Sequence, residues 1–495
     1  MIYTSLNRLI GYALKNELIT RDDIYVVRNK LMEILSLSDW VEADFEESDS
    51  DIDALLLPII EYACENSIIA DTVNSRDLFD TKIMGVFTPM PREVNARFRS
   101  VYSNSPAAAT EWYYSFSQKL NYVRAGRIKK DLKWEFDSEY GKLDITINRS
   151  KPEKDPRDIA AARNAKAACY PKCQLCAENA GFAGHATHPA RQNLRPVPMT
   201  VNGEEWQLQY SPYGYYNEHC IAFNTKHIPM KIDEHVFDKM FDILDFLPHY
   251  FIGSNADLPI VGGSILSHEH FQGGNYSFAM ARSEIEHSFK IDRFEEINAG
   301  IVKWPMSVIR VSSENREKLA ECCAYILEKW RGYSDAEAFI FAETNSIPHN
   351  TITPIARKNG SAYECDLVLR NNITTDERPL GLYHPNPSLH HIKKENIGLI
   401  EVMGLAVLPA RLAEEIVLLE NAILSGADLY SDEKLAPHAE WVGEILRNYS
   451  VDKENIRNIL EQEIGKVFLN VLEDAGVFKR NESGRSAFLR FISVL

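Results

Sequence analysis

The stretch that decides the fold of this chain is Ser267-His268-Glu269-His270-Phe271-Gln272-Gly273-Gly274. If the run is extended, its side chains alternate between two faces, so His268, His270 and Gln272 project from one side. Two imidazoles and an amide need hydrogen-bond partners that an apolar core cannot supply. We therefore expect a strand that presents these three side chains to a phosphate.

The second histidine of this stretch has the chemistry of a nucleophile. A neutral imidazole attacks phosphorus near pH 7, and the covalent nucleotidyl intermediate that forms divides one transfer into two steps. Gln272 would hold a non-bridging phosphate oxygen, and the neighbouring glycines let the backbone approach a ligand. A histidine in a strand is also often a structural residue, so the spacing alone leaves both interpretations open for His270.

Composition narrows the class of protein. With 495 residues the chain is long enough for two or three domains, and 45% hydrophobic with 25% charged residues is typical of globular proteins. A formal charge of −17 disfavours nucleic acid or an anionic membrane as the main partner. The N-terminus lacks a signal-peptide pattern, and no apolar run reaches the ~20 residues of a membrane span. Eight cysteines in so long a chain do not make a disulfide scaffold, and the lack of a secretion signal implies a reducing compartment, so we expect a cytoplasmic protein.

A Cys-x-x-Cys pair, Cys173 and Cys176, is a candidate metal site. Such a pair is half of a zinc site, a redox dithiol or two buried thiols. A zinc site needs two more ligands, for which His227 and His268 are candidates, with Cys169 or His219 as substitutes. Four protein ligands would close the tetrahedral site, so this zinc would be structural and would fix the strand that presents the second histidine.

Two arginines, Arg191 and Arg195, lie within five residues of each other in a loop rich in glycine and proline. They could clamp phosphates through bidentate contacts, although an exposed arginine is more often only solvated. We find no glycine-rich phosphate loop, and this absence removes the P-loop nucleotidases.

Patterns along the chain predict an α+β fold. Residues 1–150 read as a largely helical N-terminal region, and the charged, proline-containing connector Ser150–Asp158 marks a boundary. Beyond it we predict antiparallel strands flanked by helices. The predicted strands are 143–148, 206–216, 218–223, 338–341, 350–356 and 365–370, and the predicted helices are 237–246, 318–330 and the segments from 412 onward. A second histidine pair, His390-His391, lacks the intervening residue and cannot share one strand face, which favours a binding or structural role.

The motif His268-Glu269-His270-Phe271-Gln272 resembles the His-x-His-x-Gln motif of the nucleotidyl-transferring branch of the histidine-triad superfamily, in which the second histidine is the nucleophile. Most of the chain resembles the galactose-1-phosphate uridylyltransferases of the second type, found in Gram-positive bacteria. The blocks that carry the resemblance are Ser150 to Pro156, Cys173 to Arg195, Gly253 to Gly274, Pro348 to Pro354 and His390 to Leu412.

The resemblance implies two histidine-triad-like halves, residues 151–300 with the nucleophile and 301–495 with the C-terminal helices. It implies a ping-pong reaction in which His270 takes a uridylyl group from UDP-glucose and passes it to galactose 1-phosphate in the Leloir pathway of galactose catabolism. The backbone carbonyl of His268 would orient the His270 ring. It further implies a homodimer, structural zinc and no organic cofactor.

The same resemblance assigns further site residues. Asn255 and Ser264 correspond to nucleotide contacts and Lys394 to a sugar-phosphate contact. The zinc positions correspond to Cys173, Cys176, His227 and His268. The chain departs from the family pattern at Glu269, where a proline is usual, and by one residue inserted between Ser264 and the first histidine of the motif. An iron site of some first-type enzymes has no matching ligand set.

Two rival functions use the same residues. One is another histidine-triad enzyme, such as a dinucleoside-polyphosphate phosphorylase, which would direct the same histidine chemistry to a different acceptor. The other is a metal-stabilised nucleotide-sugar sensor that binds without turnover. Only a uridylyl-enzyme specific for UDP-glucose would exchange labelled glucose 1-phosphate into that donor without a second sugar.

Overall fold

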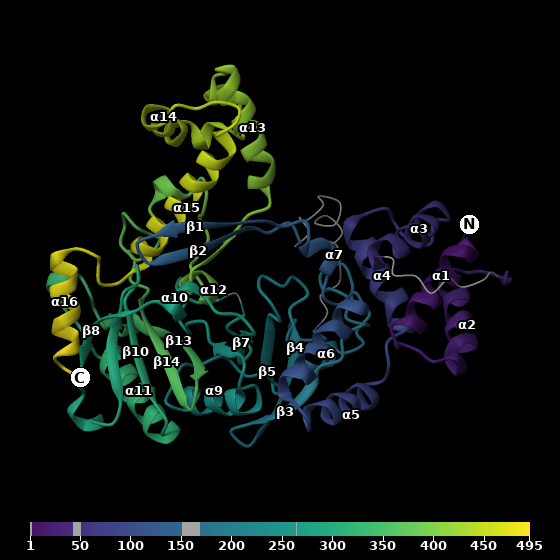
Figure 1. The fold of residues 1–495 in the computed structure, drawn as a ribbon, viewed down its shortest axis with the longest axis horizontal. Coiled ribbons are helices and arrows are strands. Elements are labelled where there is room, and N and C mark those ends of the chain that lie inside the picture. The colour runs from purple at the N-terminus through teal and green to yellow at the C-terminus, as the bar shows by residue number, and fades with distance from the viewer. Residues whose placement is uncertain (1, 43–50, 151–168, 264) are drawn as a thin grey trace. The chain divides into compact units, whose positions relative to one another are not determined.

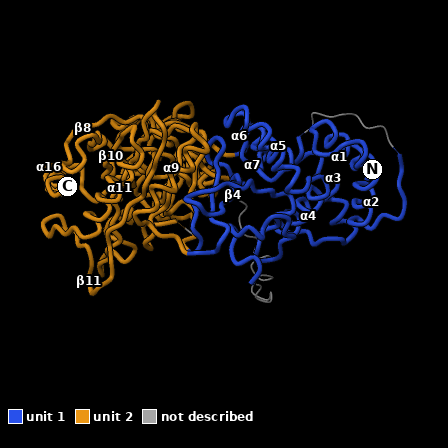
Figure 2. The backbone as a smooth tube through the Cα atoms, turned by 90° about the horizontal axis from the view of Figure 1, so that it is seen from below, with its two compact units in different colours: residues 1–130, 150–228, 267–270 blue, residues 131–149, 229–266, 271–495 orange. Residues whose placement is uncertain are grey.

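The computed structural model describes residues 2–42, 51–150, 169–263 and 265–495. The chain forms two compact units, coloured separately in Figure 2. Unit 1 consists of residues 1–130, 150–228 and 267–270, and unit 2 of residues 131–149, 229–266 and 271–495. Most of the predicted boundary connector and Ser264 lie outside the described residues. The three predicted domain ranges stay predictions.

The N-terminal part of unit 1 is helical, as the sequence predicts. Its helices are α1 (Ile2–Lys15), α2 (Ile24–Ile34), α3 (Ile52–Glu65), α4 (Val73–Val86), α5 (Pro91–Tyr102), α6 (Pro106–Lys119) and α7 (Ala125–Ile128). Helix α1 buries Leu6, Leu9, Ile10 and Ala13, whose spacing of three and four residues makes one apolar face. Helix α6 begins at a proline, and the Ser105 side chain caps it by accepting from the Ala108 N–H.

The strands of unit 1 form an antiparallel run in the order β3 (Val197–Val201), β4 (Glu204–Tyr210) and β5 (Cys220–Asn224). The β3–β4 hairpin turns at Asn202 and Gly203, which both have positive φ, as a two-residue type I′ turn requires. Tyr113 of α6 donates to the Arg195 carbonyl at 2.8 Å, and Tyr210 of β4 donates to the Thr110 carbonyl at 2.9 Å. Helices and strands of this unit therefore share one core.

Unit 2 contains the longer sheet. Its order is β7 (His270–Gly274), β6 (Phe251–Gly253), β13 (Asn350–Asn359), β14 (Ala362–Asn371), β10 (Val308–Ser313), β9 (Asn298–Val302) and β8 (Ile285–Phe289), with antiparallel neighbours. Strand β7 (His270–Gly274) starts at the last residue of unit 1 and continues into unit 2. Helices α9 (His235–Phe246) and α11 (Arg316–Arg331) pack against strands of this sheet (Figure 1).

A second sheet of unit 2 combines β1 (Leu132–Ser138), β2 (Gly141–Ile147) and β15 (Leu405–Leu408), where β15 is parallel to β2. The remaining helices are α10 (Ala279–Arg282), α12 (Leu399–Val402), α13 (Arg411–Ser425), α14 (Ala439–Asn448), α15 (Ile456–Ala475) and α16 (Glu482–Ile492). The Trp134 indole N–H donates to the Glu461 carbonyl at 3.0 Å and ties β1 to α15. A two-stranded ribbon joins β11 (Glu343–Thr344) and β12 (Ile347–Pro348).

The fold class is confirmed: helices combine with antiparallel sheets, and a helical region comes first. The predicted strand at residues 338–341 is wrong. Residues 336–338 form a 3₁₀ turn because the Asp335 carboxylate accepts from the backbone N–H groups of Glu337 and Ala338, and Phe339 then takes a φ of 56°. Such local side-chain bonds compete with a strand ladder. Within the described part of the chain, no helix is both long and apolar enough to cross a membrane.

Candidate active site and metal cluster

The predicted nucleophile is the first residue of β7. Its imidazole is buried, with 6% exposed, and Nδ1 of His270 lies 2.7 Å from the carbonyl oxygen of His268. Because a carbonyl only accepts, Nδ1 carries the hydrogen and Nε2 carries the lone pair. Burial lowers the pKa of His270 to about 4, so the ring is neutral at physiological pH. A neutral imidazole with a free Nε2 lone pair is the form that can attack phosphorus.

The predicted metal ligands meet within unit 1. Cys173, Cys176, His227 and His268 offer ligand atoms that all lie within 4.8 Å of one another. The Cys173 Sγ lies 3.1 Å from Nδ1 of His268, and the Cys176 Sγ lies 3.2 Å from Nδ1 of His227. Two thiols and two imidazoles from three separate segments are the donor set of a closed tetrahedral zinc site. The alternatives Cys169 and His219 are not members of this cluster.

His268, the first histidine of the motif, links the cluster of metal ligands to His270, the second histidine of the motif. Its Nε2 lies 2.7 Å from the Asn224 carbonyl oxygen, so Nε2 carries the hydrogen and Nδ1 turns its lone pair toward the sulfurs. Its own carbonyl receives the Nδ1–H of His270. The backbone of Glu269 is fixed as well, since its N–H donates to Ile228 at 2.8 Å and its carbonyl accepts from Asn224 at 3.1 Å. The cluster and the predicted nucleophile are therefore rigidly coupled.

Gln272 follows two residues after His270 on the same strand, which gives both side chains the same face of β7. It is half-buried and pairs in register with Gly253 of β6. The strand begins at His270 rather than before His268, so the alternation that the sequence predicts applies to the second and third members of the motif.

Asn255, a predicted nucleotide contact, is buried in unit 2 and holds the start of α12. Its Oδ1 accepts from the Leu399 N–H at 3.0 Å. A Cβ on Gly263 would lie 2.4 Å from the Asn255 Nδ2, so glycine is needed where this loop passes the amide. Asn255 thus joins the glycine-rich segment before the histidine motif to the segment that carries Lys394.

Of the two adjacent lysines, Lys394 is exposed and Lys393 is buried. The Lys393 ammonium contacts a Glu401 carboxylate oxygen at 2.9 Å and the Val407 carbonyl at 3.1 Å. Glu401 also accepts from the Gly398 N–H. An ion pair inside the fold therefore anchors the loop on which Lys394 projects to solvent.

The two loop arginines have different surroundings in unit 1. The buried Arg195 donates to the carbonyls of Pro89, Gln192 and Leu194 at 2.7–3.0 Å, which fixes its loop. Arg191 is half-buried and donates to the Ala190 carbonyl at 3.0 Å. Among the described residues it has no carboxylate partner, so Arg191 has more capacity left for an anion.

Two buried cations, Arg370 and Lys393, were not predicted from the sequence. Arg370 of β14 is fully buried and donates to the Ile397 carbonyl at 2.8 Å, and burial lowers its pKa to about 10. Lys393 is the other. Arg370 ends an apolar strand, and the pair Lys393-Lys394 gives no indication of which side chain turns inward. A charged residue at the end of the continuously buried run 365–370 is the feature that points to Arg370.

Comparisons with known proteins identify the family of this chain. Residues 18–229 match the family model described as galactose-1-phosphate uridyl transferase, N-terminal domain, and residues 243–441 match the corresponding C-terminal domain. A galactose-1-phosphate uridylyltransferase of Clostridium acetobutylicum is 53% identical over 497 residues, covering 100% of both chains. The protein of that name from Fusobacterium nucleatum is 53% identical over 99% of this chain and 98% of its own. The one from Bacillus subtilis is 46% identical over 100% and 98%.

A solved structure of yeast Ap4A phosphorylase Apa2 is similar at a TM-score of 0.33 and 13% identity, over 62% of this chain and 91% of that one. This likeness is too low to bear on function. The family models and the relatives identify the class of protein as a transferase. The chain belongs to the galactose-1-phosphate uridylyltransferase family.

Proposed function

We propose that this chain transfers a uridylyl group from UDP-glucose to galactose 1-phosphate, with His270 as the group that carries it between the two. Family membership supports the reaction, and the neutral, buried imidazole, whose Nε2 has no hydrogen-bond partner among the described residues, supports the mechanism. The second rival, a sensor without turnover, has no need for an imidazole held in this form.

The reaction divides into two displacements. In the first, the Nε2 lone pair of His270 attacks the α-phosphorus of UDP-glucose, the bond from that phosphorus to the bridging oxygen breaks, and glucose 1-phosphate leaves. In the second, a phosphate oxygen of galactose 1-phosphate attacks the same phosphorus, the N–P bond breaks and UDP-galactose forms. The Nδ1–H donates to the His268 carbonyl throughout, and this bond stabilises the positive charge that the ring gains on attack.

Four residues, Cys173, Cys176, His227 and His268, would hold structural zinc. The lone pair that Nδ1 of His268 directs at the sulfurs fits this assignment. Zinc with four protein ligands has no open position for substrate, so it would supply rigidity. Its contribution to the reaction is to fix the backbone carbonyl that orients the His270 ring.

The remaining site residues are proposed as substrate contacts. Gln272 would donate its amide to a phosphate oxygen, and Asn255 and Ser264 would contact the nucleotide. Arg191 and Arg195 would contact phosphate, for which Arg191 has the freer guanidinium, and Lys394 would contact the sugar phosphate. By resemblance to the family, we further propose a cytoplasmic homodimer that needs no organic cofactor.

Isotope exchange tests this function. The protein is incubated with UDP-glucose and labelled glucose 1-phosphate, without galactose 1-phosphate. We expect label to enter UDP-glucose, because the first displacement is reversible and complete without the second sugar. His270→Ala should abolish the exchange. Exchange that requires galactose 1-phosphate, or that survives this substitution, would contradict a uridylyl-histidine intermediate.

A further inference from the structure

Glu269 stands between the two histidines of the motif, and the proposed reaction assigns it no part. It is also the residue at which the motif departs from the family pattern. The residue is buried, with 7% exposed. A carboxylate at this depth is costly unless hydrogen bonds satisfy it, so the contacts of Glu269 indicate its role.

The backbone N–H of Glu269 fixes the peptide that precedes it. This N–H donates to the Ile228 carbonyl at 2.8 Å. It belongs to the same peptide unit as the His268 carbonyl, and the two groups of a trans peptide point in opposite directions. The bond to Ile228 therefore sets the direction of the carbonyl that accepts from Nδ1–H of His270. A proline at position 269 would have no N–H to make this bond.

The carboxylate of Glu269 holds Asn224, the last residue of β5. Its Oε2 accepts from the Asn224 Nδ2 at 2.9 Å, and the Glu269 carbonyl accepts from the Asn224 N–H at 3.1 Å. The same Nδ2 donates to Oε2 of Glu204 at 3.1 Å, and Oδ1 of Asn224 accepts from the Lys226 N–H at 3.0 Å. Exchanging the amide oxygen and nitrogen would place an acceptor against two carboxylates, so the amide has one orientation.

Asn224 passes this constraint to the His268 ring. Its carbonyl lies 2.7 Å from Nε2 of His268 and accepts that hydrogen, which leaves Nδ1 of the ring with the lone pair that faces the Cys173 Sγ. Asn224 has none of its surface exposed. Glu269 therefore acts on His268 at two points, on its carbonyl through the shared peptide and on its ring through Asn224.

We propose that Glu269 is a positioning residue for uridylyl transfer, which holds the His268 carbonyl in place and so keeps the His270 ring in the tautomer with Nε2 unprotonated. The kinetic part of this inference rests on the proposed function, and the tautomer does not. The carboxylate acts on a ring that reacts and not on a bound substrate. Its loss should therefore lower the rate of transfer without weakening the binding of galactose 1-phosphate.

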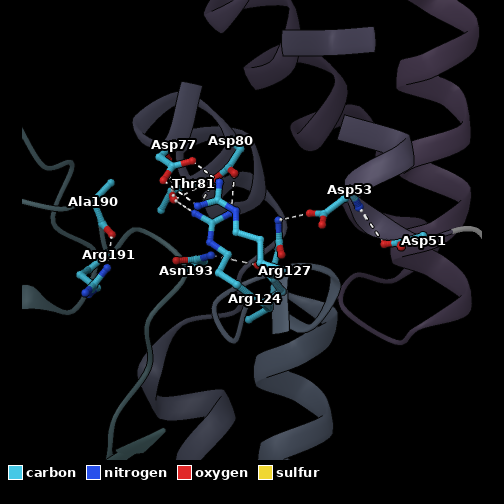
Figure 3. A network of polar contacts seen from close by, with 12 residues as sticks. Asp51, Asp53, Asp77, Asp80, Thr81, Arg124, Arg127, Ala190, Arg191 and Asn193 are labelled. Carbon is cyan, nitrogen blue, oxygen red and sulfur yellow. Dashed lines mark hydrogen bonds and ion pairs between the residues drawn. The ribbon is translucent and has the colours of Figure 1, made fainter. Parts of the chain in front are cut away.

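A second polar network of unit 1 provides a control for lost stability. Arg127 pairs with Asp77 of α4, with an Nη1–Oδ2 distance of 2.9 Å, and Arg124 pairs with Asp80, with an Nη2–Oδ1 distance of 2.8 Å (Figure 3). These pairs join α4 to α7 and to the residue before it, and they include no residue of the histidine motif. Asp77→Ala should lower the melting temperature and keep the transfer rate within about twofold of the parent.

Discharge of the uridylylated protein by galactose 1-phosphate in a single turnover tests the proposal. The rate is expressed per bound uridylyl group, so that unfolded chains do not contribute. In Glu269→Ala we expect the maximal rate to fall about 10–100-fold, while the galactose 1-phosphate concentration that gives half of it stays within about twofold of the parent. Glu269→Gln keeps an acceptor for the Asn224 amide and should recover most of this loss.

Glu204→Ala is the matched control, because it removes the other carboxylate from the same amide. The Glu204 side chain is 33% exposed, so water can take its place, and the rate should stay within about twofold of the parent. If Glu269→Ala fails to fold by circular dichroism, Asn224→Ala takes its place. That variant keeps the backbone bonds and loses the amide, and we expect the same changes from it.

Heteronuclear NMR of protein labelled at its histidine nitrogens gives a readout without substrate. The signals of His270 are those that disappear in His270→Ala. Near neutral pH they should show a protonated Nδ1 and an unprotonated Nε2 in the parent, and a mixture of both tautomers in Glu269→Ala.

Four results would overturn the proposal: an equal rate per uridylyl group in Glu269→Ala and the parent, no recovery in Glu269→Gln, a loss of the same size in Glu204→Ala or Asp77→Ala, or an unchanged tautomer in Glu269→Ala. A parent protein that takes up no uridylyl group would contradict the proposed function instead. The NMR measurement would then still decide whether Glu269 positions the ring.

Discussion

The chain contains two histidine pairs, which differ in spacing: one residue lies between the histidines of the first pair, and those of the second pair are adjacent. This difference in spacing accounts for their different contacts. His268 and His270 are two residues apart, so the carbonyl of the first accepts from the ring of the second and leaves Nε2 with its lone pair. His390 and His391 are adjacent, so their rings turn to different partners. His390 lies 3.0 Å from the Pro385 carbonyl, and His391 lies 2.9 Å from Nδ1 of His438.

The second pair forms part of a closed polar ring in unit 2. His438, with none of its side chain exposed, donates from Nε2 to Glu415 at 3.1 Å and accepts at Nδ1 from His391. Glu415 also pairs with Arg411, whose guanidinium donates to the His391 carbonyl at 2.8 Å. Although burial alone would raise the pKa of Glu415, its contacts with His438 and Arg411 lower it. These contacts join groups of the protein to one another, which favours a structural role for His391.

The largest expected effect is on turnover. His270→Ala removes the nucleophile and should lower the rate of uridylyl transfer by about four orders of magnitude or more. His391→Ala, the matched change in the second pair, should keep transfer within about tenfold of the parent. Steady-state kinetics with UDP-glucose and galactose 1-phosphate measure both. Equal losses in the two variants would remove the functional distinction between the pairs.

Metal removal should have the next largest effect. Cys176→Ser should abolish stoichiometric zinc and lower the melting temperature by roughly 5–10 °C, because it takes a ligand from the site that fixes the His268 backbone. Cys64→Ser changes a cysteine outside the cluster and is the control. Elemental analysis and thermal unfolding give the two readouts. A parent protein without zinc, or a Cys176→Ser protein that retains it, would contradict the assignment.

His438→Ala should affect stability alone. The substitution removes the donor to the Glu415 carboxylate and leaves a cavity where the buried imidazole stood. We expect it to lower the free energy of unfolding by about 2–4 kcal/mol. Denaturant unfolding measures this cost, and the amount of uridylyl bound per chain should match the parent at a temperature where both are folded. Lys434→Ala breaks an exposed ion pair with Glu414 and should change little. A loss of uridylylation in folded His438→Ala would assign the second pair a catalytic part.

The smallest effect concerns pH. Burial, with His438 and Arg411 as further causes, lowers the pKa of His391 to about 4. The folded chain therefore keeps this ring neutral where the unfolded chain takes up a proton, near pH 6.5. Its contribution to stability is complete above that pH and is lost as the pH falls toward 4, by about 1–3 kcal/mol. Unfolding curves of the parent and His391→Gln at several pH values between 7 and 4 should converge as the pH falls. Parallel curves would contradict the prediction.

The sequence predicts those helices and strands whose residues follow a regular apolar pattern along the chain. The helical spacing predicted α9 and α11, because one buried face imposes its period on the residues. The predicted strands at residues 350–356 and 365–370 lie within β13 and β14, which are buried on both faces over most of their length. The strand at residues 338–341 failed because a single carboxylate, Asp335, captures the backbone there. A local bond of this kind leaves no periodic signal.

The sequence also selected the cluster of two cysteines and two histidines, which the structure brings within 4.8 Å. It missed Lys393 and His438. Each depends on a partner in another segment of the chain, such as Glu415 for His438. Spacing identifies residues that share one strand, whereas these contacts exist only after separate segments pack.

The central claim is that the second histidine of the first pair becomes covalently bound to a uridylyl group. Mass spectrometry after brief incubation with UDP-glucose, followed by digestion under alkaline conditions, tests it most directly. We predict one uridylyl group per chain, on the peptide that contains His270, and none in His270→Ala. No adduct on the parent protein, or an adduct that persists in this variant, would contradict the account.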